Sequence, residues 1–119
     1  MWRSSAVIQG ASPDAKVWRE EVFGPVVTLD TCDSVGEGLA RANDPAHGLQ
    51  AAIFTSALGH AFTAARTLDF GGVLVNEAPT WRADLMPYGG VTESGNTREG
   101  PLHTVKEMTE SRLVVVSPG

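Results

Sequence analysis

The segment Glu21–Pro25, with the sequence EVFGP, carries side chains suited to holding a small organic molecule. A carboxylate such as Glu21 can accept hydrogen bonds from two neighbouring hydroxyl groups. An aromatic face such as Phe23 can pack on a flat ring, and Gly24 with Pro25 fixes the turn that would hold both. A purely structural interpretation instead makes Glu21 a solvated charge at a helix end and Phe23 a core residue.

A second segment with chemical potential runs from Trp81 to Gly100 and is rich in glycine. Its glycines permit positive φ angles and close approach of the backbone to other groups. Before them, Arg82 could pair with an anionic substrate group while Trp81 forms a wall of the pocket. In the alternative interpretation, Arg82 is a surface charge paired with Asp84 over a packed Trp81.

The remaining reactive side chains do not form a recognised catalytic or metal-binding pattern. Cys32, the one cysteine, lies between Asp30 and Asp33, and these carboxylates disfavour the thiolate that a nucleophile needs. We therefore expect Cys32 to have no catalytic role. The histidines have no metal-ligand spacing, so we predict no metal site; they are His47, His60 and His103.

Helices and strands that could position these side chains alternate along the chain. Short apolar runs between turn residues predict five strands, over Ala6–Gln9, Val26–Leu29, Ala51–Thr55, Val73–Val75 and Arg112–Val116. Helices are predicted over Ala15–Glu21, Val35–Ala42, Leu58–Leu68 and Leu102–Thr109. The alternation indicates an α/β fold with a mainly parallel sheet flanked by helices.

Two helices carry further signals. Ser34 and Glu37 form a capping-box pattern before the helix that starts at Val35. The third helix has apolar residues at helical spacing, which predicts that one face is buried; they are Leu58, Ala61, Phe62, Ala65 and Leu68.

Between the last two helices, Asn76–Gly100 is predicted to be a long loop of the kind that is often functional. The terminal strand, Leu113–Val116, needs a partner, which could lie on another subunit.

Composition limits the function further. We expect residues 1–119 to be one truncated domain, that is, part of a larger one. They carry nine basic and fourteen acidic side chains and a net charge of −5. This balance disfavours nucleic acid and anionic membranes as partners. A single cysteine, no long apolar run and no signal-peptide pattern at Met1–Ile8 favour a cytoplasmic setting.

Four segments, in this order, resemble signatures of the aldehyde dehydrogenase superfamily. They are Glu21–Pro25, Asn43–Leu49 (NDPAHGL), Gly72–Asn76 (GVLVN) and Pro87–Gly100 (PYGGVTESGNTREG). The last segment departs from the family pattern at Thr92, where the family has a lysine that would tether the loop, and at Thr97, where glycine is common. His47 replaces a common aromatic residue. The resemblance extends from about Ala6 to Val116.

The resemblance implies part of the catalytic domain of an NAD(P)-dependent enzyme that oxidises an aldehyde to a carboxylic acid, with a C-terminal oligomerisation strand. It assigns Glu21 to the nicotinamide ribose and Phe23 to the ring. The run PTWRADLMPYGG is similar to the branch acting on lactaldehyde, glyceraldehyde 3-phosphate or phosphonoacetaldehyde. Trp81, Arg82 and Tyr88 would therefore face the substrate.

The family's catalytic cysteine motif and dinucleotide-binding domain are not found in these 119 residues. We therefore expect the chain alone to be inactive as a dehydrogenase, and its partner to be the missing N-terminal part or further copies of itself. The alternative is a stand-alone protein with a reassigned role, either a self-associating scaffold or a non-redox enzyme. Acid/base groups for such an enzyme would be Glu21, His47, Glu77 and Asp84.

Overall fold

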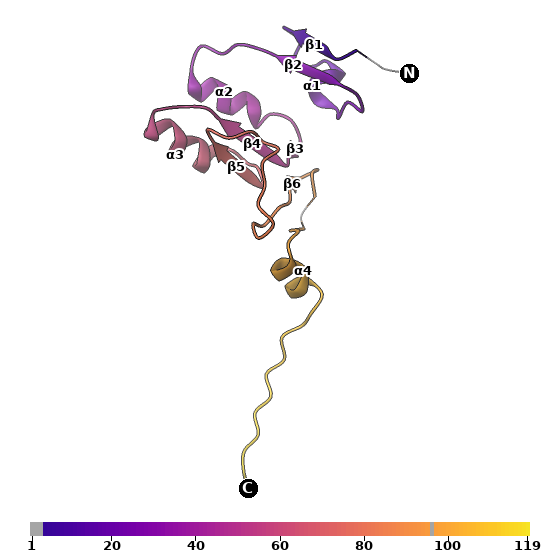
Figure 1. The fold of residues 1–119 in the computed structure, drawn as a ribbon, viewed down its shortest axis with the longest axis vertical. Coiled ribbons are helices and arrows are strands. Elements are labelled where there is room, and N and C mark those ends of the chain that lie inside the picture. Colours follow the sequence, from indigo (N-terminus) through magenta and orange to yellow (C-terminus); the bar gives the residue numbers. More distant parts are fainter. Residues whose placement is uncertain (1–3, 96) are drawn as a thin grey trace.

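The computed structural model describes residues 4–95 and 97–119, and its helices and strands alternate along the chain (Figure 1). In order, the elements are β1 (Ala6–Gln9), α1 (Lys16–Arg19), β2 (Val26–Leu29), α2 (Val35–Ala42), β3 (His47–Gly48), β4 (Gln50–Ile53), α3 (Leu58–Thr67), β5 (Gly72–Val75), β6 (Val91–Thr92) and α4 (Pro101–Glu107). The α/β class expected from the sequence is confirmed.

The strands of the described residues form three small ladders. β1 pairs with β2 in parallel, with Ala6 opposite Val26, and β4 pairs with β5 in parallel, with Gln50 opposite Gly72. Each parallel pair is joined through a helix, as parallel strands require a crossover. The third ladder is antiparallel and joins β3 to β6. Parallel pairing therefore dominates, but it is divided between separate pairs.

The capping box predicted at the start of α2 is formed with one change, because Glu37 accepts from the N–H of Asp33 and not from that of the N-cap residue Ser34. The Ser34 hydroxyl accepts a hydrogen bond from Glu37 N at 3.2 Å, and the Glu37 carboxylate accepts one from Asp33 N at 2.8 Å. The first bond satisfies a backbone N–H group that the first helical turn leaves without a partner, and the second ties the residue before the cap to the helix. The helix therefore begins at Val35, where the sequence predicts it.

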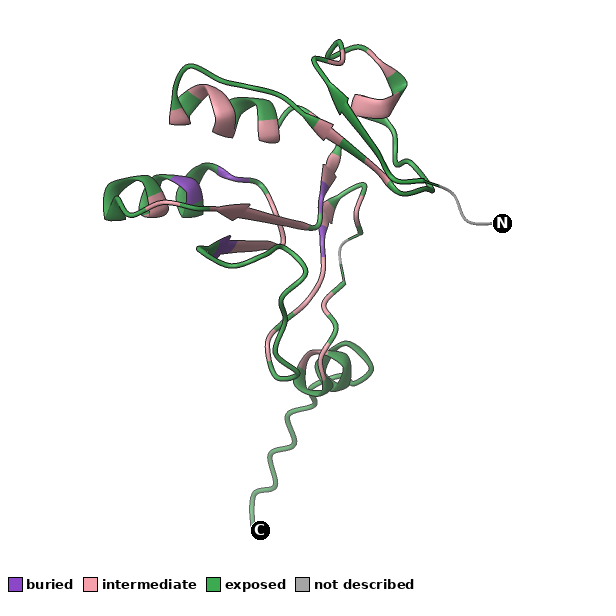
Figure 2. Ribbon diagram, turned by 45° about the horizontal axis from the view of Figure 1, so that its top comes forward, coloured by how far each residue is buried: buried purple, intermediate pink, exposed green. Residues whose placement is uncertain are grey.

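The buried core is small and lies between α3 and β5 (Figure 2). Its apolar members are Ala64, Leu68 and Leu74. On α3, the predicted apolar face is only partly correct, because Leu58 is 70% and Phe62 54% exposed. The helix instead turns Ala64 toward the strands, and the Phe62 ring lies under the guanidinium of Arg66, whose Cζ is 5.9 Å from the ring centroid.

The chain is extended for its size. Its Cα radius of gyration is 19.4 Å, whereas a compact domain of this length has about 13–14 Å. Its accessible surface is 9441 Å², against roughly 6,200 Å² for a folded monomer of this mass. Much apolar surface is therefore left uncovered within the described residues. None of the described helices has the length and apolar character needed to span a membrane.

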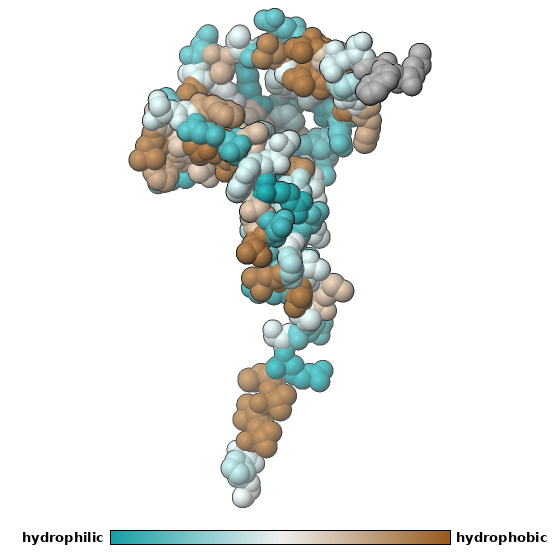
Figure 3. All heavy atoms as spheres, in the orientation of Figure 1, coloured by the Kyte–Doolittle hydropathy of each residue, from teal (hydrophilic) through white to brown (hydrophobic). Residues whose placement is uncertain are grey.

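The predicted strand over Arg112–Val116 is not formed. The chain beyond α4 runs out as an extended tail, and Figure 3 shows its apolar side chains gathered there without cover. Leu113, Val114, Val115 and Val116 are 71–88% exposed. A strand requires a neighbour to accept its backbone hydrogen bonds, and the described residues supply none for this segment.

Candidate functional site

The turn that carries Glu21 and Phe23 lies between α1 and β2 and is fixed by backbone hydrogen bonds. Gly24 N donates to Val22 O at 2.9 Å, and Ala6 N of β1 donates to Pro25 O at 2.9 Å. Phe23 is 94% exposed, so the interpretation that made it a core residue is wrong for this structure. The turn thus presents a bare aromatic face beside an exposed carboxylate.

Glu21 borders a cavity of about 670 Å³ that also contains His47. The structure therefore brings together two of the four acid/base candidates. Glu77 lines a different cavity, and Asp84 lines neither of the two. The residues around the Glu21 cavity come from α1, the end of α2, β3, β4 and the loop after β6: Trp18, Arg19, Glu20, Glu21, Ala42, Pro45, His47, Leu49, Gln50, Phe70, Glu93 and Ser94.

His47 faces a carboxylate that the sequence analysis did not single out. His47 Nε2 lies 4.0 Å from Glu93 Oε2, a separation that forms an ion pair when the imidazole is protonated. The contact depends on the β3–β6 ladder, in which His47 pairs with Thr92, the residue before Glu93. No local pattern could have revealed it, since the two segments are far apart in the sequence.

Thr92 tethers the glycine-rich loop although it replaces the family lysine. Its hydroxyl donates to Ala46 O at 2.6 Å, and Glu93 N donates to the same carbonyl at 3.0 Å. Gly48 N donates to Ser94 Oγ at 3.0 Å. Thr92 itself has φ of 55°, an uncommon conformation for a β-branched residue. These contacts hold the loop against β3 without a cation.

Three glycines allow two backbone segments to cross near β5. A Cβ atom on Gly71 would lie 1.6 Å from Gly89 O and 3.0 Å from Gly90 Cα, so no side chain fits there. Arg98 supports the crossing, because its Nη1 donates to Gly90 O at 2.6 Å. The Gly-Gly pairs at 71–72 and 89–90 therefore allow the backbone before β5 to pack closely against the backbone before β6.

The residues that the sequence analysis expected to face a substrate divide into two groups. Arg82 stacks over the Tyr88 ring, with Cζ 4.5 Å from the ring centroid, and Arg82 Nη1 lies 3.3 Å from Glu99 Oε2. The expected alternative partner, Asp84, is thus replaced by Glu99. Trp81 instead lines an apolar cavity of about 440 Å³ along β5, together with Glu77 and Met86.

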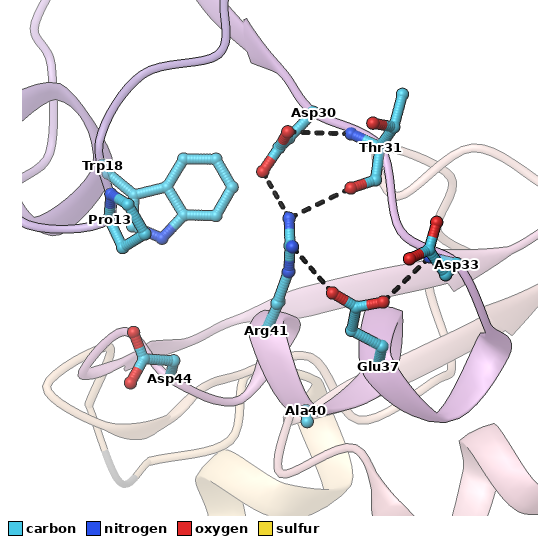
Figure 4. Close-up of a pocket in the computed structure, with 9 residues that line it drawn as sticks. All are labelled: Pro13, Trp18, Asp30, Thr31, Asp33, Glu37, Ala40, Arg41 and Asp44. Atoms are coloured by element: carbon cyan, nitrogen blue, oxygen red, sulfur yellow. Dashed lines mark hydrogen bonds and ion pairs between the residues drawn. The ribbon is translucent and has the colours of Figure 1, made fainter.

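A further cavity of about 670 Å³ lies between α1 and α2 and is organised by Arg41 (Figure 4). Arg41 donates to Asp30, to Thr31 O at 3.0 Å and to Glu37 at 2.7 Å. The backbone N–H of Asp33 and the guanidinium of Arg41 hold the pKa of Glu37 below its ordinary value. These charges are mutually paired, so the cluster braces α2 against the end of β2.

Cys32 and the histidines form no metal-binding cluster in the described residues. Cys32 is exposed at the end of β2 and lines neither the Glu21 cavity nor the Trp81 cavity. Among residues 4–95 and 97–119, no group of three or more histidine, cysteine, aspartate or glutamate side chains could hold a metal ion.

Comparison with known proteins gives consistent matches along almost the whole chain. A family profile described as "Aldehyde dehydrogenase family" matches residues 2–114. The 3-sulfolactaldehyde dehydrogenase of Priestia aryabhattai is 45% identical over 111 residues, which are 93% of this chain and 23% of that protein. A lactaldehyde dehydrogenase of Methanococcus maripaludis is 43% identical over 96 residues, 81% of this chain and 21% of its own length.

Solved structures agree with the sequence comparisons. Aldehyde dehydrogenase 21 from Physcomitrella patens, in complex with the reaction product succinate, superposes with a TM-score of 0.84 at 39% identity. The match covers 87% of this chain and 22% of that one. An indole-3-acetaldehyde dehydrogenase from P. syringae in complex with NAD+ gives 0.82 at 36% identity, covering 87% and 21%. The chain therefore spans less than a quarter of the length of the relatives it matches.

Proposed function

This chain belongs to the aldehyde dehydrogenase family, and from that membership we propose that it forms part of the catalytic domain of an NAD(P)-dependent aldehyde dehydrogenase. The reaction would convert an aldehyde to a carboxylic acid. The observation that carries the proposal is the turn after α1, where Glu21 borders a cavity of about 670 Å³ and Phe23 is 94% exposed.

The two residues fit the nicotinamide end of the cofactor. An exposed carboxylate at a cavity accepts ribose hydroxyls, and an uncovered aromatic face packs on a ring. When bound, the nicotinamide nucleotide would accept a hydride. Glu21 would then orient the ribose, and Phe23 would exclude water from one face of the ring.

The chain alone would not complete the reaction. Cys32 is separate from the Glu21 cavity and lies between carboxylates, so we do not assign it as the nucleophile. The nucleophile would come from another part of the protein or from a partner chain. Trp81, Arg82 and Tyr88 would face the substrate, a small aldehyde of the kind named for the relatives.

A chimera tests this proposal. The matching segment of the Priestia 3-sulfolactaldehyde dehydrogenase would be replaced by this chain, and the formation of reduced nicotinamide would be followed. We expect turnover, and a fall in kcat/KM of roughly tenfold or more in Glu21→Gln. Glu20→Gln is the matched control, because Glu20 lines the same cavity but pairs with Lys16. If the chimera folds and its kcat/KM is unchanged by Glu21→Gln, the proposed role of Glu21 in binding the cofactor ribose is contradicted.

One observation favours a second function, a non-redox enzyme acting through acid/base groups. Glu21 and His47 share a cavity, and Glu93 lies near the imidazole. Turnover by this chain without nicotinamide, lost in either Glu21→Ala or His47→Ala, would support this function. Dependence of all activity on the remainder of a dehydrogenase would exclude it.

A further inference from the structure

Arg82 is held between two side chains of the loop that follows β5. Its guanidinium lies over the Tyr88 ring at 4.5 Å, and its Nη1 lies 3.3 Å from Glu99 Oε2. The aromatic face restrains the plane of the guanidinium, which favours a fixed direction for its N–H donors. Arg82 is therefore a pre-oriented cation whose partner is a carboxylate.

The backbone places Glu99 beside Tyr88. Tyr88 N donates to Glu99 O at 3.3 Å, and Glu99 N donates to Tyr88 O at 2.6 Å. This bridge brings the carboxylate to Arg82 across 17 positions of sequence. The juxtaposition of the three residues is thus built by the loop's own pairing and does not arise from neighbouring residues in the sequence.

The ion pair remains open to solvent. The side chains of Arg82 and Glu99 are 46% and 63% exposed, and exposed pairs of this kind contribute little to stability. A ligand with its own anionic group can therefore compete with Glu99 for the guanidinium. Arg98, the other guanidinium of this loop, is already engaged with the carbonyls of Gly90 and Thr97.

We propose that Glu99 is a specificity-determining residue that occupies Arg82 as an internal anion, so that an anionic ligand must displace it to bind. The ligand class is a small aldehyde bearing an anionic group, since the guanidinium already holds a carboxylate in this structure. This inference rests on the proposed function, because it takes Arg82 to face the substrate. It adds that the chain selects among ligands by whether their anionic group can displace Glu99 from the Arg82 guanidinium.

The test measures anion binding by the chain alone and needs no turnover. Tyr88 is the only tyrosine of the sequence, so ring-labelled tyrosine gives a single NMR signal next to Arg82. Methanesulfonate and methylphosphonate would be titrated separately at constant ionic strength. We expect a saturable shift of this signal with the parent chain, and its loss with Arg82→Gln.

Glu99→Gln distinguishes competition from simple proximity. Removing the internal anion should tighten binding of both probes by roughly threefold to tenfold. Glu110→Gln is the matched control, since it removes the same charge beyond α4, outside the Glu21 and Trp81 cavities, and it should leave the affinity unchanged. If Glu99→Gln does not fold, Glu99→Asp replaces it, because a shorter side chain weakens the pair and should also tighten binding.

Two results would overturn the inference. One is an affinity that stays the same or falls when Glu99 is neutralised or shortened, and the other is an anion response that survives in Arg82→Gln. Either would leave the dehydrogenase proposal to be decided by the chimera. Conversely, an inactive chimera with intact competition at Arg82 would count against the dehydrogenase and not against the anion site.

Discussion

Asn76 and Thr55 exchange two hydrogen bonds at the ends of β5 and β4. Thr55 N donates to Asn76 Oδ1 at 2.7 Å, and Asn76 Nδ2 donates to Thr55 O at 2.9 Å. Asn76 has φ of 57°, a left-handed conformation that asparagine tolerates better than most residues. The asparagine of the GVLVN segment therefore closes the parallel strand pair before the chain enters the loop between β5 and β6.

Replacing Asn76 should loosen this end of the ladder. Asn76→Ala removes both side-chain bonds and strains the backbone, so we expect a loss of roughly 2 kcal/mol of stability. Asn76→Gly keeps the backbone conformation and should lose less. Amide hydrogen exchange at Thr55 provides the local measurement, and unchanged protection in Asn76→Ala would contradict the assigned role.

The crossing of Gly71 with Gly89 predicts a large effect of one methyl group. In Gly71→Ala the Cβ would lie 1.6 Å from Gly89 O, so the two segments must separate, and we expect a loss of roughly 2–4 kcal/mol in denaturant unfolding. Gly59→Ala is the control, because that helical position has open space around it. It should stabilise the chain by roughly 0.5–1 kcal/mol.

The capping network of α2 predicts a dependence on acid. The Asp33 backbone N–H and Arg41 hold the pKa of Glu37 below its ordinary value of 4.5. A carboxyl with a lowered pKa in the folded state stabilises the fold above its unfolded value, and this contribution is lost as pH falls through the folded value. The parent should therefore lose stability below about 4.5 faster than Glu37→Gln. Parallel acid unfolding curves for the two proteins would contradict this.

Local signals explain which parts of the fold could be predicted from the sequence. β1, β2 and α2 have the predicted bounds, because turn residues and the Ser34–Glu37 cap define them within a few positions. The face of α3 was predicted less well, since spacing alone does not say which of Phe62 and Ala64 has a neighbour to pack against. Burial depends on the surrounding chain as much as on the pattern.

In the candidate site too, local features could be predicted from the sequence and contacts between distant segments could not. The EVFGP turn was predicted from residue types, and the structure places Glu21 at a cavity. The pairs Arg82–Glu99 and His47–Glu93 were not predicted, because each depends on backbone pairing between distant segments. The role of Thr92 was not predicted either, since the family pattern assigns the tether to a lysine at this position, whereas here the threonine hydroxyl donates to Ala46 O.

The apolar tail predicts self-association, which we propose as the behaviour of the isolated chain. Leu113–Val116 form four consecutive apolar residues that are 71–88% exposed, and exposed β-prone segments pair with other chains. Val115→Lys should place a charge within this segment and reduce the average mass measured by light scattering after size-exclusion chromatography. Ser117→Lys carries the same charge just beyond the segment and should change the mass less.

A discrete small oligomer would mean that copies of the chain cover the tail for one another, whereas polydisperse aggregates would mean that its partner is another part of a dehydrogenase. A monomeric parent chain would contradict self-association.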